Sequence, residues 1–232
     1  ESEVAAARMA RSRWFGFAVA LTVGAGCTGG ASPTPVATAL PTGLPPGEYT
    51  TAAFRPPVTY TLPGGWLIGG DRPDYFALRP VTSDLVGIHL FRSPLAASQA
   101  LDCPIAPAAD VGTAAADLAD WIGARPGLTV GDPVAVSLGG LGGLRLDVEI
   151  VEGWAVSCPF ANGLPTVPLF VSPTDPDFRW VIAGSERLRL DVLDVPGNGT
   201  IVVDIDAFDG SLMDALLPAA SPIVEGMRFG LP

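Results

Sequence analysis

The segment RLRLDVLDVPGNGTIVVDID, residues 187–206, decides the fold of this chain. In its two halves, 187–192 and 201–206, an apolar side chain recurs at every second position. That period places alternate side chains on opposite faces of a β-strand. Asn198-Gly199 lies between the halves, and this dipeptide is a strong signal for a tight hairpin turn. We therefore predict an antiparallel hairpin with one face on a core and its charged face in water.

Similar patterns extend away from this hairpin along the chain. Residues 144–150 alternate strictly between apolar and charged side chains, which is typical of a further strand of the same sheet. Short apolar runs bounded by turn residues predict more strands. These runs are 59–63, 66–70, 75–79 and 86–91, with a last short strand at 228–229.

Two helices are also predicted. Apolar side chains recur at helical spacing within 114–124, where Thr113 is the predicted N-cap and a following Pro-Gly pair ends the helix. A terminal helix is expected from about 212, interrupted around Pro218 and Pro222. The elements together predict an α+β domain in which an antiparallel sheet of about seven to nine strands packs with two or three helices.

The order of elements from about 57 to 229 resembles the PsbP-like α/β sandwich. The resemblance rests on two end motifs, Leu62-Pro-Gly-Gly-Trp66 and Ile223-Val-Glu-Gly-Met-Arg-Phe229. That fold occurs in photosystem subunits and in bacterial envelope lipoproteins. The resemblance implies a binding or adaptor role, because known members of the fold are mostly not enzymes. It transfers no catalytic residue.

The N-terminal region has the charge order of a signal peptide. Three arginines, at 8, 11 and 13, precede 13 uncharged residues from 14 to 26. This stretch is shorter than the roughly 20 residues that a membrane span needs. We therefore predict a signal peptide over 1–26, whose true start is Met9 if the residues before it are an upstream extension.

Cys27 closes the segment LTVGAGC, which resembles the lipobox of bacterial lipoproteins. The resemblance implies that Cys27 carries a diacylglycerol thioether with palmitate-like chains. Such a group would anchor the protein in the cell membrane, facing the extracytoplasmic side. Gly24 departs from the family pattern, which has an aliphatic residue three positions before the cysteine. Simple secretion after Gly26 or Ala31, and an uncleaved anchor, are the alternatives.

A proline-rich run follows the cysteine. Residues 28–47 contain five prolines, four glycines and no charged side chain. Such a run buries too little apolar surface to offset its ordering entropy. We expect 27–47, the acylated cysteine with this run, to tether a single globular domain over 48–232. A Pro-rich ligand or a glycosylated stalk is the alternative interpretation of the run.

The net charge of the chain limits its partners. There are 24 Asp and Glu residues against 13 Lys and Arg, for a formal net charge of −11. Binding to nucleic acid rests on basic side chains that neutralise phosphates, so we expect no nucleic-acid partner. Adhesion to anionic lipid headgroups is disfavoured for the same reason. The expected partners are the membrane, through the lipid anchor, and an unknown envelope protein or small ligand.

The three cysteines suit an exported protein. If Cys27 is acylated, Cys103 and Cys158 remain as one possible disulfide pair, with two separate buried thiols as the alternative. Closing a loop of about 55 residues would stabilise the fold by on the order of 4 kcal/mol.

His89 is the single histidine, so any Ser-His-Asp or Cys-His scheme must use it. It lies within an apolar strand and no Gly-x-Ser-x-Gly motif accompanies it, which favours a structural or surface role. One histidine and a disulfide leave only carboxylates as metal ligands, so we expect no metal site and no cofactor.

Two pairs of carboxylates have simple structural interpretations. Asp204 and Asp206 do not have the spacing of an EF-hand calcium loop, and we expect them on the wet face of the hairpin, beside its arginines. Asp175 and Asp177 lie in a Pro-rich loop. We expect a solvated turn there rather than a carboxylate pair for glycoside hydrolysis.

The leading hypothesis is a membrane-tethered lipoprotein with a non-catalytic binding or adaptor domain. An envelope hydrolase is one alternative, and it predicts a deep pocket that gathers carboxylates such as Asp175 or Asp147. A sugar- or solute-binding lipoprotein is another. Its candidate ligand-contact aromatics are Trp66, Trp154 and Trp180, for which core packing is the default.

Overall fold

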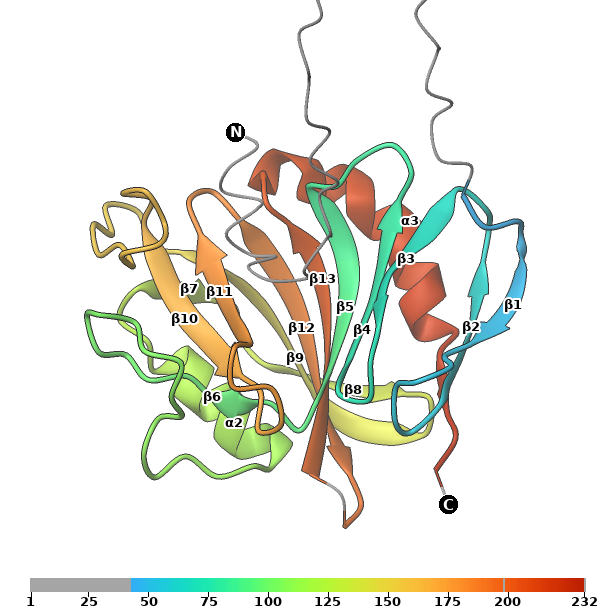
Figure 1. The fold of residues 1–232 in the computed structure, drawn as a ribbon, viewed down its shortest axis with the longest axis horizontal. Helices are drawn as coiled ribbons and strands as arrows, with labels where there is room; N and C mark the ends of the chain where they lie inside the picture. The colour runs from blue at the N-terminus through green and yellow to red at the C-terminus, as the bar shows by residue number, and fades with distance from the viewer. Residues whose placement is uncertain (1–42, 198, 232) are drawn as a thin grey trace, which may run out of the picture.

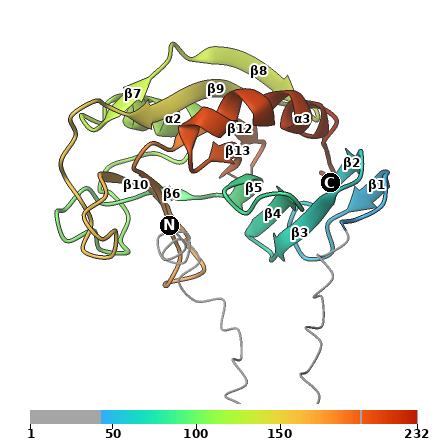
Figure 2. The same cartoon turned by 90° about the horizontal axis from the view of Figure 1, so that it is seen from above.

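An eight-stranded, mostly antiparallel sheet forms the centre of the structure, a computed structural model that describes residues 43–197 and 199–231. The strand order is β3-β4-β5-β13-β12-β9-β7, and β8 pairs with β9 as well. Figure 2 shows the sheet curving from β3 and β4 at one end to β8 and β9 at the other. Its strands are β3 (Trp66–Asp71), β4 (Tyr75–Pro80), β5 (Val86–Arg92), β7 (Leu128–Val130), β8 (Val134–Leu138), β9 (Leu141–Ile150), β12 (Arg187–Val195) and β13 (Gly199–Ala207).

The predicted hairpin is confirmed, and it lies at the middle of this sheet. β12 and β13 pair antiparallel from Arg187 opposite Ala207 to Val195 opposite Gly199. β9 extends the sheet beyond β12, and β5 extends it beyond β13. The α+β class is confirmed too. Asn198, the predicted signal peptide over 1–26 and Cys27 lie outside the described residues.

The expectation that the hairpin has one wet face is wrong, because both faces of the central strands are buried. Ile201, Val203 and Ile205 point into one hydrophobic cluster, while Val202 belongs to a second cluster on the other side. Each face is covered by a helix and a small sheet. Figure 1 shows α3 (Met213–Glu225), β1 (Gly47–Thr50) and β2 (Val58–Leu62) to the right of the central strands. It shows α2 (Ala115–Gly123), β6 (Leu95–Ala96) and β10 (Thr166–Val171) to their left.

The first cluster is enclosed by α3 (Met213–Glu225) and by a three-stranded sheet of order β1-β2-β14. Strands β1 (Gly47–Thr50), β2 (Val58–Leu62) and β14 (Arg228–Phe229) bring both ends of the domain together. A short 3₁₀ turn, η1 (Gly210–Leu212), leads into α3. β14 is the short terminal strand predicted at 228–229, which is thereby confirmed.

The second cluster is enclosed by α2 (Ala115–Gly123) and by a sheet of order β11-β10-β6. These strands are β6 (Leu95–Ala96), β10 (Thr166–Val171) and β11 (Arg179–Ala183). Leu118 and Ile122 of α2 and Phe170 of β10 are completely or almost completely buried. Most of this cover, α2, β6 and β10, is distant in sequence from the hairpin, while β11 comes directly before β12. The period of the hairpin strands alone does not reveal either part of the cover.

Helix α2 begins one residue later than predicted. Ala114, not Thr113, is the N-cap, and its side chain makes no capping hydrogen bond. Two carboxylates accept the hydrogen bonds that a capping hydroxyl would otherwise accept. Asp117 Oδ2 accepts from Ala114 N–H at 3.2 Å, and Asp194 Oδ1 accepts from Ala115 N–H at 2.8 Å. Acidic oxygens satisfy the free amides of a helix N-terminus.

Helix α3 is not interrupted at its prolines. Pro218 and Pro222 both lie inside it. A proline within a helix removes a backbone hydrogen bond and normally kinks or ends the helix. Here the buried apolar side of α3 packs on the first cluster, and tertiary packing of this kind supplies most helical stability in proteins.

The start of the domain lies slightly before residue 48. Leu44 forms a β-bridge with Trp66, and Tyr49 Oη donates to Pro45 O at 2.8 Å. The last residues of the predicted tether therefore contact the domain. Within the described residues, no helix has the length and apolar character that a membrane crossing requires.

Candidate functional site

The predicted disulfide is present. Cys103 and Cys158 are bonded, with their Cα atoms 5.6 Å apart. Both residues are buried, beside Ala161 and the half-buried Phe160. Arg179 of β11 donates from Nη1 to Cys103 O at 3.0 Å, and its guanidinium lies 4.4 Å from the Phe160 ring centroid. The disulfide thus links the loop between β6 and α2 to the loop between β9 and β10.

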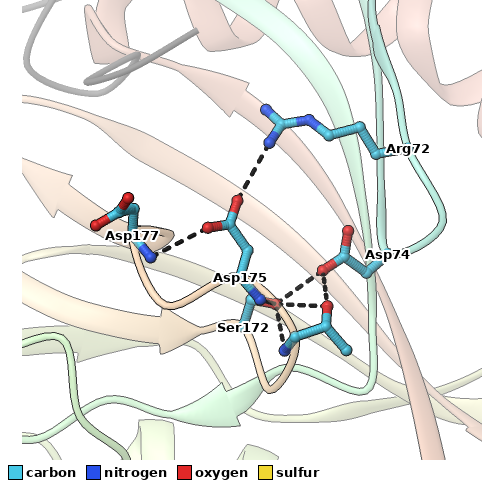
Figure 3. Close-up of polar contacts among 6 residues, drawn as sticks. Arg72, Asp74, Ser172, Asp175 and Asp177 are labelled. Atoms are coloured by element: carbon cyan, nitrogen blue, oxygen red, sulfur yellow. Dashed lines mark hydrogen bonds and ion pairs between the residues drawn. The ribbon is translucent and has the colours of Figure 1, made fainter.

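Asp175 belongs to a set of polar contacts between two loops, drawn in Figure 3. Arg72 Nη1 lies 3.3 Å from Asp175 Oδ2. Asp74 Oδ2 accepts from Ser172 Oγ at 2.7 Å and from Thr174 Oγ1 at 2.5 Å. We call these five residues the loop latch. It fixes the turn between β3 and β4 to the loop between β10 and β11.

The two carboxylates of the Pro-rich loop do not face each other across a cleft. Asp177 N–H donates to Asp175 Oδ1 at 3.0 Å, while Oδ2 of Asp175 is directed to Arg72 (Figure 3). The hollow beside the latch has a volume of about 10 Å³, which is too small for a substrate. Asp147, the other carboxylate of the hydrolase hypothesis, pairs with Arg189 on the sheet. This geometry is that of a turn held by ion pairs and hydrogen bonds.

We expect the contribution of the loop latch to the free energy of unfolding to depend on pH. Burial alone would raise the pKa of Asp74, but hydrogen bonds from Thr174 and Ser172 outweigh it and hold the pKa below its ordinary value. A carboxyl with a lowered folded pKa stabilises the fold above its unfolded pKa, and that contribution disappears as pH falls through the folded pKa. Ser172→Ala also removes the acceptor of the Thr174 and Asp175 N–H groups, a loss that does not depend on pH. Urea denaturation between about pH 6 and pH 2 should therefore show a loss for Ser172→Ala that is about 1 kcal/mol larger at pH 6 than at pH 2.

Ser137→Ala is the matched control, because Ser137 is exposed on β8 and belongs to no part of the latch. It should leave the unfolding free energy unchanged at both pH values. An equal loss for Ser172→Ala at pH 6 and pH 2 would contradict the role given to Asp74.

His89 lies in a mostly buried polar group that the sequence did not predict. Its Nδ1 is 2.9 Å from Tyr75 Oη, and its Nε2 is 3.5 Å from Asp206 Oδ2. Trp180 covers the imidazole at 4.6 Å between ring centroids, and its Nε1 donates to Asp204 Oδ2 at 2.9 Å. Asp204 is 0% exposed and Asp206 is 4% exposed. Their predicted position on a wet face is therefore wrong.

Two of the three candidate ligand-contact tryptophans are core residues. Trp66 is 4% exposed and packs in the first cluster, and Trp180 is 5% exposed in the second. Neither ring presents a face on which a sugar from solvent could stack. Trp154 is half-buried against the second cluster, and its Nε1 donates to Thr166 O at 3.2 Å.

A larger hollow opens where β5 ends and β13 begins. It has a volume of about 230 Å³. Two arginines, Arg55 and Arg92, line it together with apolar side chains from the loop before β2, the central hairpin and the C-terminal segment. Sequence reasoning missed it because no motif marks it. One signal was available: Arg92 continues the every-second-residue series of Ile88 and Leu90, whose side chains are buried in the first cluster.

Comparisons with known proteins find similarity in structure alone. No protein-family model matches the chain, and no curated protein sequence matches it. Among solved structures, the chain is similar to the cyanobacterial PsbP (CyanoP) of Synechocystis sp. PCC 6803, at 10% identity and a TM-score of 0.40, over 78% of this chain and 92% of that one. A protein of Bacteroides thetaiotaomicron is similar at 9% identity and a TM-score of 0.33, over 75% of this chain and 45% of that one. The α+β fold rests on the strand pairing described above.

Proposed function

We propose that this chain is an exported, lipid-anchored protein whose folded domain binds a ligand and catalyses no reaction on it. The observation that carries the proposal is the bond between Cys103 and Cys158. Disulfides persist in oxidising compartments outside the cytoplasm. The chain has three cysteines, so Cys27, inside its lipobox-like segment, is the one left for acylation.

The binding role is supported by where the reactive side chains lie. Asp175 and Asp147 form ion pairs with arginines, and neither lines a deep pocket. His89 lies under Trp180 and contacts Tyr75 at one ring nitrogen and Asp206 at the other. A general base must reach a substrate proton, and these contacts occupy both nitrogens of the imidazole. The hollow at Arg92, at about 230 Å³, has room for a small ligand, whereas the hollow beside the latch does not.

The anchor has a direct test in the full chain. Wild-type protein expressed in a bacterial host should sediment with membranes and be released by detergent, because two acyl chains hold a protein stably. Cys27→Ser should move most of the protein to the soluble extracytoplasmic fraction. The double variant Cys103→Ala/Cys158→Ala is the matched control, and it should stay with the membranes. Equal membrane attachment of Cys27→Ser and wild type would contradict the lipid anchor.

A further inference from the structure

We infer that the hollow at Arg92 binds a small organic carboxylate with a short apolar body. This deepens the binding function proposed above by naming the class of ligand. Three observations carry it: a half-buried arginine with no ion pair, a second arginine held in place beside it, and apolar walls around both.

Arg92 is half-buried and forms no ion pair in the described part of the chain, although it also borders the small hollow lined by Asp74 and Asp175. Among residues 43–197 and 199–231, its guanidinium makes no ion pair and no hydrogen bond. Arg72, Arg145, Arg187, Arg189 and Arg228 form ion pairs with carboxylates. Arg79, Arg125 and Arg179 are half-buried without such a pair, like Arg92, but they do not line this hollow. Removing a guanidinium from water without an anion beside it is costly. An anionic ligand would supply the missing partner.

Arg55 is oriented by its own loop. Its Nη1 donates to Ala52 O at 3.1 Å and to Phe54 O at 2.9 Å. A guanidinium has five N–H donors, so those on Nε and Nη2 remain for a ligand. Because the side chain is already held, it loses little rotamer freedom when a ligand binds. Arg55 and Arg92 both line the hollow, and arginine binds carboxylates through paired hydrogen bonds.

The remaining walls select an apolar body rather than a bare ion. No acidic side chain lines the hollow, and its apolar lining consists of Pro56, Pro57, Val195, Ile201 and Leu231. Its volume of about 230 Å³ equals that of roughly eight water molecules. Inorganic phosphate would contact the arginines but leave these walls wet. A carboxylate with about ten non-hydrogen atoms satisfies the arginines and also buries hydrocarbon.

Octanoate is a suitable probe, titrated calorimetrically into the full chain carrying Cys27→Ser. That substitution removes the need for detergent, into which octanoate would partition. We expect saturable binding that Arg92→Met weakens about tenfold or more, because a hydrogen bond to a charged group is lost. Arg92→Lys should keep part of the affinity. Arg79→Met is the matched control: Arg79 is a half-buried arginine of β4 outside the hollow, and its loss should change nothing.

Two further ligands separate the possible sources of binding. Octan-1-ol, which has the same chain without the charge, should bind about tenfold or more weakly. Inorganic phosphate should bind more weakly than octanoate. If phosphate binds with the same dependence on Arg92 and octanoate does not, the carboxylate assignment is overturned. Octanoate binding that survives Arg92→Met unchanged would overturn it too, as would no binding at all.

The design covers the case in which Arg92→Met folds poorly. Arg55 is exposed, so Arg55→Met should leave the fold intact and weaken octanoate binding severalfold. A melting temperature measured for each variant separates lost binding from lost folding. Failure here is also distinct from failure of the anchor, since membrane attachment is read from Cys27 alone.

Discussion

Replacing Arg145 by Met should lower the free energy of unfolding by about 3–5 kcal/mol, because it leaves a buried carboxylate without its partner. Arg145 Nε lies 2.6 Å from Asp191 Oδ1, and its Nη2 lies 2.8 Å from Oδ2. The two residues are directly opposite each other on β9 and β12, and the Asp191 side chain is 3% exposed. Urea denaturation of the variant and of wild type at neutral pH measures the loss.

The neighbouring pair gives the matched control. Arg189 and Asp147 lie opposite each other on the same two strands and form the same two-bond contact, at 2.7 and 2.9 Å. The Asp147 side chain is 57% exposed, so Arg189→Met should cost less than about 1 kcal/mol. Equal losses for the two substitutions would show that burial of the carboxylate is not the deciding factor. The double variant Arg145→Met/Asp191→Leu should recover most of the stability.

Reduction of the disulfide should lower the free energy of unfolding by about 4 kcal/mol, because it releases a long loop in the unfolded chain. Cys103 and Cys158 are 55 residues apart in sequence. Thermal and urea unfolding with and without dithiothreitol should show this loss in wild type. Cys103→Ala/Cys158→Ala should show the same loss and no response to the reductant. Equal stability of oxidised and reduced wild type would remove the main support for an oxidising compartment.

The strands of the central sheet could be predicted because their signal is local. Residues 187–192 and 201–206 carry a period of two, and the structure places them in β12 and β13. The burial of the second face could not be predicted in this way. Asp204 is buried because Trp180, from β11, covers it and donates a hydrogen bond. A contact between separate layers leaves no trace in the spacing of either strand.

Local sequence signals also gave wrong predictions for the two helices, where contacts with other elements override them. Pro218 and Pro222 each predict a break, yet α3 continues through both because its apolar side lies on the core. At α2 the hydroxyl of Thr113 was the expected cap, but Asp194 of β12 supplies an oxygen instead. In both cases the deciding partner lies on another element.

The candidate sites also differ in whether a signal in the sequence could reveal them. The pairing of Cys103 with Cys158 followed from counting cysteines, and the structure confirms it. The loop latch joins Arg72 to Asp175 across 103 residues, which no local pattern indicates. The hollow depends on Arg92 meeting the loop before β2 and the C-terminal segment in space. Residue types alone therefore identified covalent chemistry better than they identified a binding surface.

The central claim is that the domain works at a membrane, held by acylated Cys27. The most direct measurement is the intact mass of the protein extracted from the membranes of a bacterial host. We predict a mature chain that begins at Cys27 and carries the added mass of a diacylglyceryl group. A chain without lipid, cleaved after Gly26 or Ala31, would contradict the claim.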